Sequence, residues 1–250
     1  VGISSVFVAI VSPVLGAIAD RMPIKKKILK VYTVVGILFT GLMGLAPYMD
    51  EDSSYKFLAI CLIMGNIGFA GGHAIYSAFL PYLGDKRLMD HISSWGYAYG
   101  FLGGCILLTF HLAVGLKFGF ENPDVQCFVF VTSALWWLGF SIPMFLNTPE
   151  PEIPNPTEYS TTLEAVADGL REIKNTFMEI RRYKVLSLFM CGYLLFYDGV
   201  NAIGGLAAAY ADSVLRIDFT MNFVLLLSAN VVAIPMTIIG GRLAGKYGNK

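Results

Sequence analysis

Long apolar runs alternate with short polar segments along the whole chain. Seven of the runs are about 18 to 27 residues long, and about 20 helical residues cross the hydrocarbon core of a bilayer. They are Val1–Ala19, Val31–Tyr48, Phe57–Leu83, Ile92–Leu116, Gln126–Leu146, Val185–Ala211 and Thr220–Gly240. A helix satisfies its backbone hydrogen bonds within one segment, so such runs predict transmembrane helices. The pattern therefore predicts an all-α, polytopic membrane protein.

The positive charges lie outside these runs and fall almost entirely on one side of the membrane. If the chain passes through the runs in order, 15 of the 18 Lys and Arg residues share one side. The other side holds Lys56, Lys117 and Arg216. Cytoplasmic connections carry the excess of Lys and Arg, so the larger group marks the cytoplasm. We therefore expect the chain to enter its first run from outside and to end inside.

The composition supports a membrane protein and narrows its chemistry. Mean hydropathy is +0.63 and 14% of the residues are charged, against about 25% in a typical soluble domain. The four cysteines have no CxxC spacing, which argues against a zinc site and against a disulfide framework. No P-loop, HExxH or GxGxxG motif occurs. We therefore expect no enzymatic activity, no cofactor, no metal, no nucleic-acid partner and no transport driven by ATP.

One connection, Asn147–Lys184, is much longer than the others. Its first part, Thr148–Pro156, is rich in proline and therefore stiff and extended. A helix should follow, because Thr161 and Glu164 fit a capping box and apolar residues then recur at spacings of three and four. The apolar positions are Leu163, Val166, Leu170, Ile173, Phe177 and Ile180, and the polar face carries Glu164, Asp168, Arg171, Glu172, Lys174 and Glu179. Such an amphipathic helix lies on a membrane or on the protein's own cytoplasmic face.

Two related segments end the first and the seventh run. The first segment contains, in this order, Gly16, Asp20, Arg21 and Lys25. The second, Gly241–Lys250, has a similar order of glycine, small residue and cation. The first segment resembles the signature loop of the major facilitator superfamily, and transporters are often built from such internal repeats. Glycine permits close helix packing, and Asp20 can pair with a cation or a helix N-terminus in one access state only. The alternative is an ordinary positively charged stop at a helix end.

Asp198 is the only acid well inside a predicted span. Acids within membranes are costly and mark substrate or proton pathways by default. Asn201 lies about one turn further along, and Asn66 and His73 share a face of the third run because they are seven residues apart. These four residues are our candidates for the substrate or proton pathway. The alternatives are an acid that braces helices and, for Asn66 and His73, hydrogen bonds between helices.

Several stretches, in order along the chain, carry a more specific resemblance. They are Ser12–Asp20, Tyr76–Pro81, Ile92–Gly104 and Phe196–Asn201, the last behind a helix that contains Gly169-Leu170-Arg171. Together they resemble the autophagy-related vacuolar amino-acid effluxers, a branch of the major facilitator superfamily. The resemblance implies two six-helix halves, of which this chain would hold helices two to eight. Residues 1–147 would then form five spans of the first half, 148–184 a cytoplasmic linker, and 185–250 two spans of the second half.

The expected function is secondary active transport of a small solute by alternating access. The resemblance implies efflux of amino acids, from a vacuole or another endomembrane compartment in a eukaryote or across the plasma membrane in a prokaryote. The expected partners are the solute, a proton or ion gradient and the lipid bilayer. Transport of another solute class remains open. A non-transporting scaffold or receptor on the same fold is the main alternative, and a membrane-embedded enzyme is a weaker one.

Overall fold

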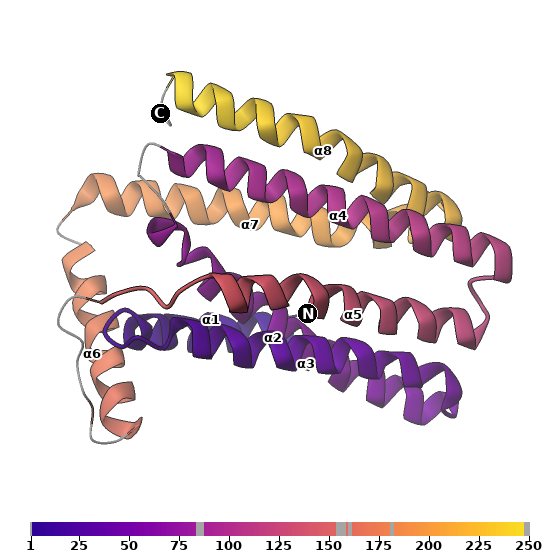
Figure 1. Ribbon diagram of the computed structural model, residues 1–250, viewed down its shortest axis with the longest axis horizontal. Helices are drawn as coiled ribbons and strands as arrows, with labels where there is room; N and C mark the ends of the chain where they lie inside the picture. The colour runs from indigo at the N-terminus through magenta and orange to yellow at the C-terminus, as the bar shows by residue number, and fades with distance from the viewer. Residues whose placement is uncertain (1, 84–87, 154–158, 160–161, 181–182, 248–250) are drawn as a thin grey trace. The chain divides into compact units, whose positions relative to one another are not determined.

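The computed structural model of the chain is a set of helices joined mostly by short connections (Figure 1). It describes residues 2–83, 88–153, 159, 162–180 and 183–247. Within these residues there are eight α-helices, two 3-10 helices and no strand. The α-helices are α1 (Gly2–Ala19), α2 (Lys25–Leu42), α3 (Glu51–Ser77), α4 (Met89–Phe118), α5 (Pro123–Asn147), α6 (Thr162–Ile180), α7 (Lys184–Ser213) and α8 (Phe219–Tyr247); the 3-10 helices are η1 (Met43–Tyr48) and η2 (Leu80–Tyr82). The all-α prediction is confirmed for this part of the chain.

Six helices of the described residues are long and apolar enough to cross a membrane. They are Lys25–Tyr48, Glu51–Tyr82, Met89–Phe118, Pro123–Asn147, Lys184–Gly204 and Thr220–Tyr247. The remaining predicted run, Val1–Ala19, corresponds to α1, which covers Gly2–Ala19. Each predicted run therefore coincides with a helix of the described part of the chain.

The acidic connections on the predicted outer side serve as helix caps. Asp50 precedes α3, and its carboxylate accepts a hydrogen bond from the backbone N–H of Ser53 at 3.2 Å. The side-chain hydrogen bond with Ser53, then its backbone N–H, lowers the pKa of Asp50. Asn122 precedes α5 and accepts from the backbone N–H of Asp124 at 2.9 Å. Each cap satisfies a backbone donor that the helix start leaves without an intrahelical partner.

The first compact unit consists of Val1–Lys86 and Val114–Ile173. In it α2 packs against α3 and α5, and α1 packs against α3. Helix α3 approaches α2 so closely that a Cβ on Gly68 would overlap the backbone of Gly36. The ring of Tyr32 occupies the corresponding space over Gly71. These glycines of the third predicted run therefore serve close helix packing, as small residues commonly do in membranes.

The second compact unit consists of Arg87–Ala113 and Lys174–Lys250, and it contains most of α4 together with α7 and α8. Gly241 of α8 lies against Ser94 of α4, and a Cβ on this glycine would overlap the serine side chain. Further along the same pair of helices, a Cβ on Gly104 would lie 3.5 Å from the amide oxygen of Asn230. The serine- and glycine-rich block of the fourth run therefore contacts α8 at Ser94 and Gly104.

Candidate functional site

The connection from α1 to α2 together with the first two residues of α2, here called the gate loop (Asp20–Lys26), contains an ion pair. The Nζ atom of Lys25 lies 2.8 Å from Oδ1 of Asp20 and 3.2 Å from the hydroxyl of Tyr82. The Lys25 side chain is 3% exposed, whereas that of Asp20 is 70% exposed. A cation at a helix N-terminus is unfavourable, so Lys25 at the start of α2 needs these partners. Three of the four predicted gate residues thus lie in one loop, and Asp20 and Lys25 are in direct contact.

Gly16, the fourth predicted gate residue, lies one turn before the loop. A Cβ on Gly16 would meet no atom of the described structure within 4 Å. The close helix approach that we expected from this glycine therefore does not occur here. Its counterpart in the second copy of the repeat, Gly241, does make such an approach.

Arg21 of the gate loop binds the linker helix α6. Its guanidinium donates to the carboxylate of Asp168 and, at 2.6 Å, to that of Glu172. The hydroxyl of Tyr159 donates to Asp168 at 2.8 Å. The hydrogen bond with Tyr159, and then the charges of Asp168 and Glu172, raise the pKa of Arg21 against the opposing effect of burial. Figure 1 shows α6 running past the end of the helices from which the loop emerges.

The start of the linker binds the other end of the gate loop. The carboxylate of Glu150 accepts a hydrogen bond from the backbone N–H of Lys26 at 2.9 Å, and the Lys26 ammonium donates to the carbonyl of Thr148 at 2.7 Å. Ile24, at the N-cap of α2, makes no side-chain cap. Glu150 therefore supplies a negative charge at the start of α2, and Lys26 supplies a positive charge at the end of α5.

Two of the predicted pathway residues, Asn66 and His73, lie on α3 in the first unit. The Asn66 amide donates to the carbonyl of Leu62 in its own helix at 2.9 Å. The ring of His73 lies 6.4 Å from that of Phe69, one turn away on the same helix. The interactions found for these side chains are therefore within α3, and the interhelical hydrogen bonds that we considered are not among them.

The other two, Asp198 and Asn201, lie on α7 in the second unit, and their side chains fall outside the described part. On the preceding turns Tyr193 and Tyr197 stack with ring centroids 5.6 Å apart, and Phe189 stacks on Tyr193 at 6.5 Å. The sequence prediction did not include this row of rings, although its spacing of four residues is visible in the sequence.

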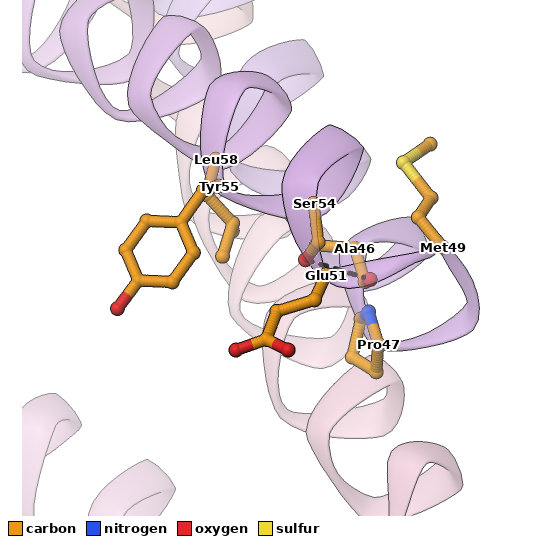
Figure 2. A pocket seen from close by; sticks show the side chains of 7 residues that line it. All are labelled: Ala46, Pro47, Met49, Glu51, Ser54, Tyr55 and Leu58. Carbon is orange, nitrogen blue, oxygen red and sulfur yellow. Dashed lines mark hydrogen bonds between the residues drawn. The ribbon is translucent and has the colours of Figure 1, made fainter.

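A cavity of about 400 Å³ lies where α3 begins (Figure 2). It is lined by Ala46, Pro47, Met49, Glu51, Ser54, Tyr55 and Leu58. The Ser54 hydroxyl donates to the Ala46 carbonyl at 3.0 Å, which fixes η1 against the first turn of α3. None of the predicted site residues lines this cavity, and it offers a single carboxylate. Within the described residues, no group of three or more His, Cys, Asp or Glu side chains is placed to hold a metal ion.

Sequence reasoning missed the partners of the gate loop. Nothing in the sequence marked Tyr82 as a partner of Lys25. Asp168 and Glu172 were placed on the polar face of the linker helix, and their spacing of four residues was the available indication of a two-carboxylate site. Glu150 stood in the proline-rich stretch, with nothing in the local sequence to connect it with Lys26.

Comparison with known proteins identifies the family. A family model described as "Vacuole effluxer Atg22 like" matches residues 1–250, the whole chain. The chain belongs to this family. This Atg22-like chain is 29% identical over 258 residues to the "Uncharacterized MFS-type transporter YxiO" of Bacillus subtilis, covering 100% of the chain and 57% of that relative. The predicted family and the helical facilitator-type bundle are confirmed, and the chain is an integral membrane protein.

Two further relatives extend the comparison. Autophagy-related protein 22 of Yarrowia lipolytica is 27% identical over 170 residues, covering 62% of this chain and 27% of the relative. A Staphylococcus aureus protein, provisionally named a proline/betaine transporter, is 25% identical over 245 residues, covering 95% of this chain and 50% of the relative. The Atg22-like chain thus spans at most a little over half the length of these relatives. No solved structure matches it significantly.

Proposed function

We propose that the Atg22-like chain is part of a secondary active transporter that moves a small zwitterionic solute, foremost an amino acid, by alternating access. The observation that carries the proposal is the gate loop, in which a buried lysine is paired with an exposed aspartate where three helices end. Family membership supports the same function, since the family is described by efflux from vacuoles. The protein would then act at the vacuolar membrane in a eukaryote and at the plasma membrane in a bacterium.

The Asp20–Lys25 pair supplies an interaction that can differ between access states. Lys25 is almost fully buried, so its ammonium requires partners for as long as it remains there. Asp20 is mostly exposed, so water can solvate its carboxylate when it leaves the pair, and the cost of breaking the pair is low on this side. A change of access that draws α1 away from α2 would break the pair and leave Tyr82 as the remaining partner of Lys25. The pair therefore favours the state in which these helix ends are together.

Asp198 is the proposed polar centre of the pathway, with Asn201, Asn66 and His73 as further contacts. A carboxylate in α7 would attract the ammonium group of an amino acid, or carry a proton between the two aqueous sides. The names of the relatives support this class of solute, since proline and betaine are zwitterions. A proton or ion gradient would drive the cycle, because this chain contains no P-loop.

The test uses the full-length protein in liposomes, with radiolabelled amino acids and with or without a pH gradient. Asp198→Asn should abolish gradient-driven amino-acid movement and leave the protein folded, because asparagine has nearly the same volume. Asp218→Asn, an exchange at the start of α8, is the matched control and should transport as the wild type does. If Asp198→Asn transports at the wild-type rate with the same pH response, Asp198 only braces helices. If the wild type moves no amino acid, the proposed solute is wrong.

The gate is tested separately in the same liposomes. Asp20→Asn removes the charge of the ion pair, so it should change the transport rate without preventing insertion or folding. Glu121→Gln, at an exposed position next to the α5 cap, is the control. Normal expression with an unchanged transport rate for Asp20→Asn would make Asp20 an ordinary surface acid.

A further inference from the structure

We propose that the linker helix α6 is a clasp on the gate loop, and that the clasp stabilises the gate in the arrangement described above. The clasp consists of Asp168 and Glu172 of α6, which bind Arg21 of the gate loop, and of Gly169, which lies against the end of α1; Ala165, one turn before Gly169, is buried. The docking stands on contacts alone, whereas its effect on the gate rests on the proposed transport function. The two parts are therefore tested by different measurements.

The first observation is the face by which α6 packs. Ala165 is 6% exposed, and a Cβ on Gly169 would lie 3.2 Å from Cγ1 of Ile18 and 3.3 Å from the carbonyl of Val14. Leu170, on the predicted apolar stripe, is 53% exposed. A helix held by hydrophobic burial alone would turn its large apolar side chains inward. Gly169 faces α1 instead, and Ala165, one turn before it, is buried, which is the arrangement of a specific close contact.

The second observation is the charge on that face. Asp168 and Glu172 lie one turn apart, and both bind the guanidinium of Arg21. The hydroxyl of Tyr159 also donates a hydrogen bond to Asp168. Two carboxylates on one guanidinium use several of its donors in fixed directions, which a lysine would not do. The ion pairs thus determine the position of α6 along α1 and its rotation about its own axis.

The third observation is that the linker binds the gate loop at two places, once at Glu150 before α6 and once through α6 itself. Glu150 binds the backbone N–H of Lys26, and α6 binds Arg21, so both contacts fall within the gate loop. Residues 154–158 and 160–161, which join the two contacts, lie outside the described part. Asp20 and Lys25 pair with each other inside the same loop. A rearrangement of the loop must therefore break the linker contacts or carry α6 with it.

Docking is tested by cysteine labelling of the full-length protein after its native cysteines have been replaced by alanine. In this chain these are Cys61, Cys105, Cys127 and Cys191. Ala165→Cys and Ala167→Cys form a matched pair two residues apart, the first buried and the second exposed. A maleimide should label position 165 much more slowly than position 167. Adding Arg21→Gln should raise the rate at 165 by roughly three- to tenfold and leave 167 unchanged, because the lost ion pairs are partly exposed. Equal labelling of the two positions in the wild type would overturn the docking.

Coupling to the gate is tested by transport. The double variant Asp168→Asn with Glu172→Gln loosens the clasp without altering the gate loop, and Glu179→Gln, exposed near the end of the same helix, is the control. If the clasp stabilises one access state, loosening it should raise turnover by roughly threefold, and the control should not. Suppose position 165 is protected in the wild type and labels faster in the double variant. Unchanged or slower transport by the double variant would then overturn the coupling and leave the docking. Absence of transport in the wild type would refute the proposed function, while the labelling would still decide the docking.

Discussion

Gly68→Ala should destabilise the first unit, because the added methyl group has no space. Its Cβ would overlap the backbone N and Cα atoms of Gly36 and would lie 2.8 Å from the carbonyl oxygen of Tyr32. All three are backbone atoms of the neighbouring helix α2, so no side chain can rotate away. Helices α2 and α3 must therefore move apart, and the contacts along their whole interface weaken together.

The size of the effect follows from two opposing terms. Ordinary contacts of a Cβ begin near 3.4 Å, and the nearest backbone atom, the N of Gly36, would lie about 1 Å closer than that, so the helices must separate by about 1 Å. Overpacking of this kind costs about 1–3 kcal/mol. Alanine in a helix interior is more favourable than glycine by roughly 0.5–1 kcal/mol. Because the clash is with backbone atoms that cannot rotate away, the overpacking cost lies in the upper half of its range. The net loss is then about 1–2 kcal/mol, or a factor of roughly 5–30 in the ratio of folded to unfolded protein.

Gly65→Ala is the matched control, one turn earlier on the same buried face of α3. Its Cβ would lie 3.5 Å from the terminal methyl of Met43, an ordinary contact with a flexible side chain. The measurement is thermal unfolding of the purified full-length protein in one detergent, followed by tryptophan fluorescence. Gly68→Ala should melt roughly 3–6 °C below the wild type, and Gly65→Ala at or above it. Equal melting temperatures of the two variants would refute the backbone contact between α2 and α3.

Two further predictions concern topology and the second unit. A cysteine at Ser53 should react with an impermeant maleimide added outside intact cells, and one at Thr157 should not, because the excess of cations places the linker in the cytoplasm; labelling of Thr157 from outside would reverse the topology. Gly241→Ala should lower the melting temperature because its Cβ overlaps Ser94, whereas Gly240→Ala, with no described atom within 4 Å, should not. Equal melting of those two variants would contradict the α4–α8 contact.

The helices were predictable because their signals are local. Runs of about 20 apolar residues and a spacing of three and four were enough to locate the spans and the linker helix. The first run, Val1–Ala19, coincides with α1, which spans Gly2–Ala19. The apolar stripe of α6 was visible, but it did not indicate the docking face, which is formed by Ala165 and Gly169. Small residues leave little trace in a hydrophobic pattern.

The candidate site was predictable only in part, because its contacts are distant in sequence. Asp20 and Lys25 are five residues apart, and their pairing could be anticipated from the loop itself. Arg21 and Asp168 are separated by 147 residues, so their contact depends on how α6 docks. A sequence shows which side chains are charged and on which side of the membrane they lie. It does not show which of several carboxylates on that side reaches a given guanidinium.

The docking of the linker also limits the reach of the tether that joins α5 to α7. By sequence, the tether runs from Thr148 to Lys184, and a free chain of that length would span on the order of 120 Å when extended. With α6 bound to the end of α1 and the gate loop as far as Glu172, the tether beyond that contact runs only from Ile173 to α7. That part reaches roughly 25 Å. The bound linker therefore joins α5 to α7 with a far shorter reach than its length in sequence suggests.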